Sequence, residues 1–191
     1  MDQIDTAVRV LSRDGLIVYP TETVYGLGAD ALSEDAVLKV YAVKGRPLSK
    51  PISIAVSDMD MLGAVAVVDE AARAFIERFL PGPVTVILPA KSCLPEIITG
   101  GTGLVGIRWP AHEIALAIIA RLDSPITATS ANVSGEIPPT RPEDVYIPGD
   151  YLVDGGELPG TPSTVVDLTT LRILRKGAEW EAVEEFLKTL R

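Results

Sequence analysis

The sequence predicts an α+β protein, close to the α/β class, in which helices flank one twisted sheet with parallel and antiparallel strands. Two observations carry this prediction. Short apolar runs alternate with segments of helical periodicity along the whole chain, and some of the strand-like runs follow one another with no helix between them. The length of 191 residues suits one large domain, so we expect residues 1–191 to form a single unit.

The first part of the chain opens with a helix. Residues 4–11 carry apolar side chains at helical spacing, and residues 16–19 form a short apolar run that predicts a buried strand. Ser33 can cap a second helix over residues 33–43. A strand over residues 51–56 follows it.

The middle of the chain repeats this alternation. Residues 69–79 form an amphipathic pattern, and the sequence Pro81-Gly82-Pro83 ends it. Strands are expected over residues 84–88 and 104–109. A helix over residues 112–122 comes next.

The last part is richer in strands. A final helix is expected over residues 179–190, and residues 132–149 form a long polar loop with several prolines, which favours a functional role. The expected strands are 126–129, 151–153, 164–168 and 172–174.

Composition narrows the classes of protein. The net charge of −9 argues against nonspecific nucleic-acid binding, which usually needs a basic protein. No uncharged apolar run reaches the ~18–20 residues of a membrane span. The start of the chain, Met1-Asp2-Gln3-Ile4-Asp5, is acidic where a signal peptide is basic, and Cys93 is the one cysteine. We therefore expect a cytoplasmic protein.

Two short segments carry most of the chemical information. Residues 44–51 place Lys44, Arg46 and Lys50 around a glycine and two prolines, which indicates a stiff loop that holds cations in an array suited to a polyphosphate. Residues 129–132, Thr-Ser-Ala-Asn, put small hydroxyl and amide groups after an apolar strand. Together they predict a nucleotide site without a glycine-rich phosphate loop.

Other motifs do not support a site. Residues 101–106 match GxGxxG, but a strand follows where the dinucleotide fold needs a helix, so a tight turn is the better interpretation. His112 and Cys93, the only residues of their kinds, cannot build a zinc cage. We expect His112 to lie at the surface or to cap a helix. No metal ligands among the protein side chains are identified.

These segments, together with Pro20-Thr21-Glu22-Thr23-Val24-Tyr25-Gly26-Leu27-Gly28, occur in the order seen in the YrdC family, which the chain resembles from about residue 16 to residue 177. The resemblance implies a nucleotidyltransferase of tRNA processing. It would make L-threonylcarbamoyladenylate from L-threonine, bicarbonate and ATP and release pyrophosphate, as the first step of threonylcarbamoyladenosine modification.

The resemblance also implies roles for individual residues. Lys44 and Arg46 would be catalytic and, with Lys50, would stabilise the phosphates of ATP while Mg²⁺ bridges them. The same ATP site would include Ser130, Asn132 and Arg175.

The amino-acid site needs a cation for the carboxylate and partners for the threonine hydroxyl. Arg108, at the end of a strand, suits bidentate pairing with a carboxylate. Thr21, Thr23 and Tyr25 lie just past another strand. The remaining members of this predicted threonine site are Thr129 and Ser163.

One departure from the family stands out. Some members carry a histidine in the strand after the cationic loop, whereas residues 52–56 here, around Ala55, contain none. Two other functions stay open: a related carbamoyltransferase that forms a carbamoyl-adenylate, and an RNA-binding module that uses the cationic loop on tRNA phosphates. In the preferred interpretation the product passes to a separate tRNA-modifying complex, tRNA binds weakly or not at all, and no membrane is involved.

Overall fold

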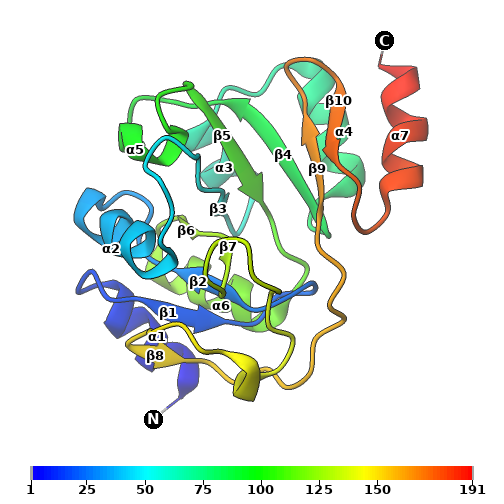
Figure 1. The fold of residues 1–191 in the computed structure, drawn as a ribbon. Coiled ribbons are helices and arrows are strands. Elements are labelled where there is room, and N and C mark those ends of the chain that lie inside the picture. The colour runs from blue at the N-terminus through cyan, green and yellow to red at the C-terminus, as the bar shows by residue number, and fades with distance from the viewer. Residues whose placement is uncertain (1, 191) are drawn as a thin grey trace.

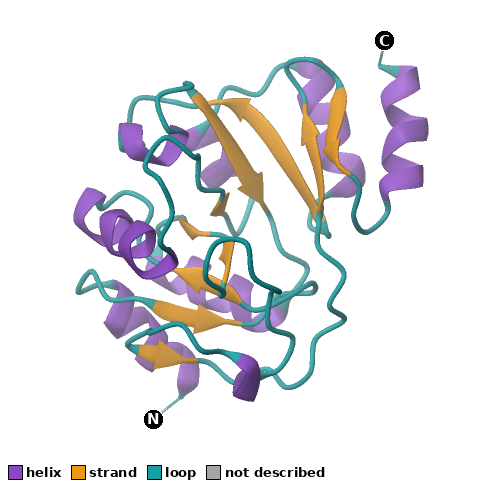
Figure 2. Ribbon diagram, viewed as in Figure 1, coloured by secondary structure: helices purple, strands orange, loops and turns teal. Residues whose placement is uncertain are grey.

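The computed structural model describes residues 2–190 and combines helices with two mixed sheets (Figures 1 and 2). The helices are α1 (Gln3–Leu11), α2 (Glu34–Lys44), α3 (Met59–Val65), α4 (Glu70–Phe79), α5 (Glu96–Thr99), α6 (Glu113–Leu122), the 3₁₀ turn η1 (Pro142–Asp144) and α7 (Trp180–Thr189). The strands are β1 (Ile17–Tyr19), β2 (Gly26–Gly28), β3 (Ile54–Ala55), β4 (Val84–Pro89), β5 (Leu104–Arg108), β6 (Ile126–Thr127), β7 (Thr129–Ser130), β8 (Tyr151–Leu152), β9 (Thr164–Asp167) and β10 (Arg172–Arg175).

The strands form two sheets, where the sequence predicted one. The four-stranded sheet has the order β7-β2-β1-β8, and the six-stranded sheet has the order β10-β9-β4-β5-β3-β6. Each contains both parallel and antiparallel pairs: β1 is antiparallel to β2 and parallel to β8, and β4 is antiparallel to β5 and parallel to β9. The α+β class with mixed strand pairing is confirmed. The number of sheets differs because long-range pairing, which periodicity does not encode, sorts the strands.

The expected strand over residues 126–129 is divided between the two sheets. Its first part, β6, pairs with β3 of the six-stranded sheet, and its second part, β7, pairs with β2 of the four-stranded sheet. Ala128, between them, donates its backbone N–H to the carbonyl of Ser53 at 2.7 Å. One short segment therefore fixes the position of each sheet relative to the other.

Thr127 strengthens this junction through its hydroxyl. Thr127 is fully buried, and its Oγ1 accepts from the backbone N–H of Ala29 at 3.0 Å and donates to the carbonyl of Leu27 at 2.8 Å. Its own N–H donates to the carbonyl of Ala29 at 2.8 Å. A residue of the six-stranded sheet is thereby bound to the end of β2 in the other sheet.

The five helices expected from periodicity are present, and their capping residues explain where they begin. The Ser33 side chain accepts from the N–H of Ala36 at the start of α2, and Asp69 does the same for Ala72 at the start of α4. His112 precedes α6, but its side chain makes no capping hydrogen bond. The capping role considered for His112 is therefore wrong.

Elements that the sequence did not reveal are short or rich in glycine. Helices α3 and α5 are too brief to show a helical period, and β2 consists of Gly-Leu-Gly. A Cβ added at Gly26 or Gly28 would lie 3.0 Å from the ring of Tyr19. The packing of that ring against β2 therefore explains why residues with weak strand preference form a strand here.

Helices cover the outer faces of the sheets. Figure 1 shows α1 and α6 against the four-stranded sheet and α4 and α7 beside β9 and β10. Phe75 and Phe79 of α4 pack against Phe186 of α7, with ring centroids 6.0 and 5.5 Å apart. Within residues 2–190, no helix combines the length and the apolar character needed to cross a bilayer.

We predict that Thr127→Val lowers the free energy of unfolding by about 1–3 kcal/mol, because the buried N–H of Ala29 loses its acceptor. Thr127→Ser keeps the hydroxyl and is the control; its loss should be smaller. Urea denaturation of the three proteins measures the effect. Equal stability of Thr127→Val and the wild type would contradict the role of the hydroxyl at the junction.

Candidate active site

A cleft of about 250 Å³ lies between the two sheets. Its walls come from the loop after β1, the loop after α2 and the ends of β4 and β5. The segment of residues 126–130 that joins the two sheets, called the junction segment below, and the segments around β9 and β10 complete them. The predicted site residues on its lining are Thr23, Arg46, Arg108, Thr129, Ser130, Ser163 and Arg175. The fold thus gathers residues from the whole length of the chain into one site.

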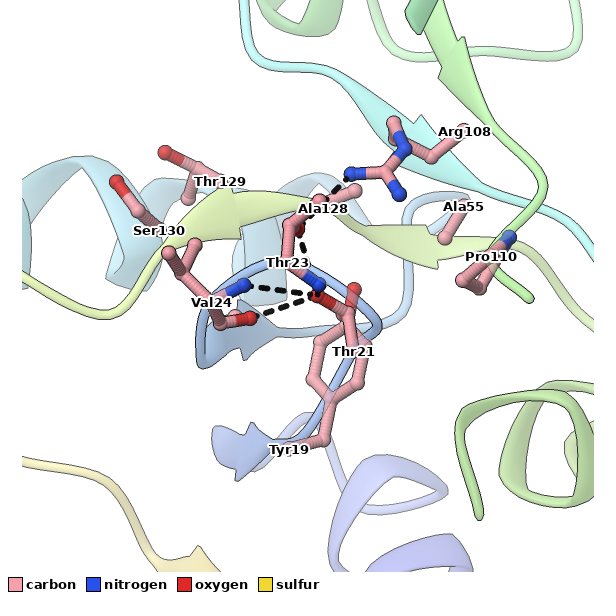
Figure 3. Close-up of a pocket in the computed structure, with 11 residues that line it drawn as sticks. Tyr19, Thr21, Thr23, Val24, Ala55, Arg108, Pro110, Ala128, Thr129 and Ser130 are labelled. Atoms are coloured by element: carbon pink, nitrogen blue, oxygen red, sulfur yellow. Dashed lines mark hydrogen bonds between the residues drawn. The ribbon is translucent and has the colours of Figure 1, made fainter. Parts of the chain in front are cut away.

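A smaller chamber adjoins this cleft (Figure 3). Thr23, Arg108, Thr129 and Ser130 line both cavities. The chamber adds apolar walls from residues that include Ala55, Pro110 and Ala128. Ala55 belongs to β3, the strand after the cationic loop in which the sequence lacks a histidine, and contributes only a methyl group to the chamber wall.

The cationic loop begins where α2 ends. Gly45 adopts a left-handed conformation with φ of 59° and stops the helix, which turns the next residues toward the cleft. The Arg46 guanidinium donates to the carbonyls of Pro51 at 2.8 Å and Lys50 at 3.3 Å, so backbone groups hold it in place. Lys50 is exposed and does not line either cavity.

Lys44 joins the cationic loop to the hydroxyl-rich segment. It is only 2% exposed, and its ammonium donates to the backbone carbonyls of Ser130 at 2.5 Å and Asn132 at 2.7 Å. Burial, followed by the positive charge of Arg46, lowers the pKa of Lys44 to about 8. Its ammonium lies behind the lining of the cleft, where it links two segments that are far apart in the sequence.

Asn132 also makes local contacts. Its Nδ2 donates to the carbonyls of Val133 and Glu136, each at 2.9 Å. Its Oδ1 is buried and has no hydrogen-bond partner among the described residues. The side chain therefore shapes the turn after Ser130 and keeps one acceptor unused.

Arg108 ends β5 and lies on the lining of both cavities. Its guanidinium forms an ion pair with Glu22 and makes longer contacts to Thr23 Oγ1 at 3.5 Å and the carbonyl of Gly82 at 3.4 Å. Glu22 was not predicted as a site residue. Its acidic side chain inside the 20–28 motif was the available signal.

The threonine hydroxyls beside Arg108 have a defined direction. Thr21 donates its one hydroxyl proton to the carbonyl of Val24 at 2.7 Å. In the 2.9 Å contact between the two threonines, Thr23 is therefore the donor and Thr21 the acceptor. Figure 3 shows these hydrogen bonds beside the Arg108 guanidinium. Thr23 Oγ1 also accepts the long contact from Arg108 Nη1 at 3.5 Å, which leaves one lone pair that can accept a hydrogen bond from a ligand hydroxyl.

Ser163 and Arg175 line the larger cleft but not the chamber. Arg175 donates to the carbonyl of Ser163 at 2.8 Å and to its Oγ at 3.0 Å. Burial, and then the charge of Arg108, lowers the pKa of Arg175. Ser163 Oγ also lies 2.8 Å from the hydroxyl of Thr85, which belongs to the expected strand over residues 84–88 and was not predicted as a site residue. A threonine inside an otherwise apolar strand was the signal for it.

Tyr25, the glycine-rich segment 101–106 and Cys93 line neither the cleft nor the chamber. The Tyr25 hydroxyl donates to the carbonyl of Gly156 at 2.8 Å and accepts from the N–H of Gly155 at 3.0 Å, and its pKa is raised by burial. Gly101 and Gly103 lie in a turn that leads into β5, as predicted, and Gly106 lies within that strand. Cys93 is exposed.

The arrangement concentrates positive charge in an acidic protein. Arg46, Arg108 and Arg175 line one cleft, although the net charge of the chain is −9. A cleft with low-dielectric walls focuses such a local field. The site can therefore bind a polyanion in the cleft and a small molecule with a carboxylate and a hydroxyl in the adjoining chamber.

Lys44 leads to a prediction about pH. Its pKa in the folded protein lies below that of lysine in an unfolded chain, so the unfolded state binds more protons and stability rises with pH. From about pH 8 to 10.5, the wild type should gain up to about 3 kcal/mol relative to Lys44→Met. Urea unfolding across this range measures it, with exposed Lys39→Met as the control. A constant or falling difference would contradict burial of the ammonium.

Comparison with known proteins shows which family the chain resembles. The family Sua5_yciO_yrdC, described as telomere recombination, matches residues 9–177. A threonylcarbamoyl-AMP synthase of Pyrococcus abyssi is 43% identical over 189 residues, which cover 94% of this chain and 56% of that protein. One from Xanthomonas campestris pv. campestris is 37% identical, with 91% and 94% covered.

The solved structure of P. abyssi Sua5 complexed with L-threonine superposes with a TM-score of 0.91 at 41% identity, over 96% of this chain and 56% of that one. A Bacillus subtilis threonylcarbamoyl-AMP synthase is 42% identical over 86% of this chain and 49% of that protein. The chain thus spans about half the length of the P. abyssi and B. subtilis relatives. With a family match over most of its length and a cleft built from the shared motifs, the chain belongs to the Sua5/YciO/YrdC family.

Proposed function

We propose that this chain synthesises L-threonylcarbamoyladenylate from L-threonine, bicarbonate and ATP and releases pyrophosphate. The observation that carries this proposal is the convergence of Arg46, Arg108 and Arg175 on one cleft that adjoins a small chamber lined by hydroxyls. Relatives named threonylcarbamoyl-AMP synthase support it. The site separates a place for a polyphosphate from a place for an amino acid.

ATP binds in the larger cleft in this proposal. Arg46 and Arg175 stabilise its phosphates directly, and Lys44 and Lys50 add positive charge at the cationic loop. Ser130 and Asn132 contact the nucleotide from the end of the junction segment. Cations placed where charge develops on the departing phosphates stabilise the transition state.

Mg²⁺ enters with the nucleotide. Among residues 2–190, no three His, Cys, Asp or Glu side chains come together in a way that could hold a metal ion. We therefore propose that Mg²⁺ arrives bound to the phosphates of ATP, as part of the substrate, and we assign no protein ligand to it.

L-Threonine binds in the smaller chamber in this proposal. Arg108 pairs with its carboxylate, and the remaining lone pair of Thr23 Oγ1 accepts its hydroxyl. Thr129 lies on the wall of the chamber, and Ser163 reaches from the adjoining cleft. Ala55, Pro110 and Ala128 pack against the methyl group. Tyr25 contributes by holding the residues around Gly155 and Gly156.

The reaction needs little covalent chemistry from the protein. The threonine amine takes up carbon dioxide derived from bicarbonate, a carbamate oxygen attacks the α-phosphorus of ATP, and pyrophosphate leaves. The side chains bring the two substrates together and stabilise charge. We further propose that the chain acts in the cytoplasm, hands its product to a separate tRNA-modifying transferase, and binds tRNA weakly or not at all.

The proposed function predicts a strict substrate requirement. Pyrophosphate release from ATP should depend on both L-threonine and bicarbonate, because the attacking carbamate forms from the two. The measurement is a pyrophosphate assay in degassed buffer with each component omitted in turn. Equal release without threonine or without bicarbonate would contradict the synthase.

The chamber predicts an order among amino acids. Serine lacks only the methyl group, and an apolar wall rejects it by about 10–200-fold in kcat/KM. Valine lacks the hydroxyl that Thr23 would accept, so it should be the poorer substrate by about 10⁴-fold. Arg108→Ala should weaken threonine binding and leave ATP binding largely intact.

The same pyrophosphate assay at matched concentrations of the three amino acids tests this order. The exposed arginine of β10 supplies the control variant, Arg172→Ala, which should behave like the wild type. Valine turned over as well as serine would show that no group in the chamber recognises the hydroxyl.

A further inference from the structure

Glu22 approaches Arg108 from outside the two cavities. The two side chains form a partly buried ion pair, with exposed fractions of 15% for the Glu22 side chain and 9% for that of Arg108. Arg108 lies on the lining of both cavities, whereas Glu22 lies on neither. The carboxylate therefore acts on the site through the charge and orientation of the arginine.

The other two arginines of the cleft have no such partner. Arg46 donates to the carbonyls of Lys50 and Pro51, and Arg175 donates to Ser163. Among residues 2–190, no carboxylate lies within ion-pair distance of Arg46 or Arg175, so their full charge is available to a ligand. The cleft thus combines two arginines without a carboxylate partner and one arginine whose charge a carboxylate compensates.

This asymmetry matters because the two proposed substrates differ in charge. A polyphosphate carries several negative charges and gains most where arginines are uncompensated. A free amino acid is a zwitterion without net charge: it gains from a directional bond to its carboxylate, but an uncompensated cation repels its ammonium. An arginine that already has a carboxylate beside it therefore favours the amino acid over the polyphosphate.

Two buried atoms fit this interpretation. Arg108 Nε and Glu22 Oε2 are buried and have no hydrogen-bond partner among the described residues. Native structures rarely leave such groups without a hydrogen-bond partner. The ion pair therefore has one unused donor, Arg108 Nε, and one unused acceptor, Glu22 Oε2. The unused Nε donor belongs to Arg108, which lines both cavities, so it has the polarity needed for the carboxylate of a bound amino acid.

We propose that Glu22 is a specificity-determining residue: by compensating Arg108, it reserves the chamber for a net-neutral amino acid and keeps phosphate groups at Arg46 and Arg175. This inference rests on the proposed function, since it assigns the amino acid to the chamber. Glu22 is a positioning residue here, because it acts through Arg108 and need not touch either substrate.

The wild-type protein provides the first test, by calorimetric titration with L-threonine in the absence and presence of saturating inorganic pyrophosphate. The dissociation constant of threonine should change by less than about twofold, because separate sites do not compete. Competition between threonine and pyrophosphate in the wild type would overturn the inference. Failure of threonine to bind at all would instead overturn the proposed function.

Glu22→Gln provides the second test, since it removes the charge and keeps the size. Pyrophosphate should now compete with threonine and raise its apparent dissociation constant about tenfold or more, because Arg108 is no longer compensated. Glu22→Asp keeps the charge and should resist competition, as should Glu113→Gln, which removes an exposed carboxylate at the start of α6.

Thermal unfolding of each variant shows whether it is folded. A folded Glu22→Gln protein that binds threonine independently of pyrophosphate would overturn the inference. If Glu22→Gln does not fold, the wild type and Glu22→Asp decide: the inference stands only if both bind threonine without competition. A purely structural role for Glu22 would lower stability without creating competition, so the inhibition pattern separates the two explanations.

Discussion

The structure depends on a junction of five residues, Ile126 to Ser130, that belongs to both sheets. A strand of ordinary length would extend one sheet and leave the other without a fixed position. Here β6 pairs in one sheet and β7 in the other, and the buried hydroxyl of Thr127 bonds to backbone groups at both Leu27 and Ala29. The cleft exists because this segment holds the sheets together at one place and leaves them apart beside it.

The cation of Lys44 extends the same principle to the loops. A buried ammonium is unfavourable unless carbonyl groups replace its water shell, and the carbonyls of Ser130 and Asn132 do so. The consequence is that the cationic loop and the junction segment have a fixed separation. Arg46, two residues after Lys44, is therefore placed at the cleft by an interaction that lies behind it.

Charge organises the cleft in a way that net charge does not reveal. An acidic protein repels polyanions at long range, but salt screens that field over about 10 Å. Close to the site the three arginines dominate, and they are not equivalent. Arg46 and Arg175 have neutral partners, while Arg108 has Glu22. One cleft therefore contains both compensated and uncompensated arginines.

The sequence alone located the five long helices and several residues that line the cleft. Periodicity and caps such as Ser33 and Asp69 are local, so they located the five long helices. The cationic loop and the segment after residue 128 were also recognisable, because stiffened cations and clustered hydroxyls indicate phosphate chemistry without any knowledge of the fold. Seven of the predicted side chains, including Arg46, Arg108 and Arg175, do line the cleft.

Only the tertiary structure decided how those residues are used. The separation into two sheets, the strand at Gly26–Gly28 and the interior positions of Lys44 and Tyr25 depend on partners distant in the sequence. Glu22 is the clearest case, since its ion-pair partner is an arginine at the end of β5, far away in the sequence. Local sequence patterns show which chemical groups a chain carries. Contacts between distant segments decide which of these groups face a ligand, because burial and charge compensation depend on neighbours in space.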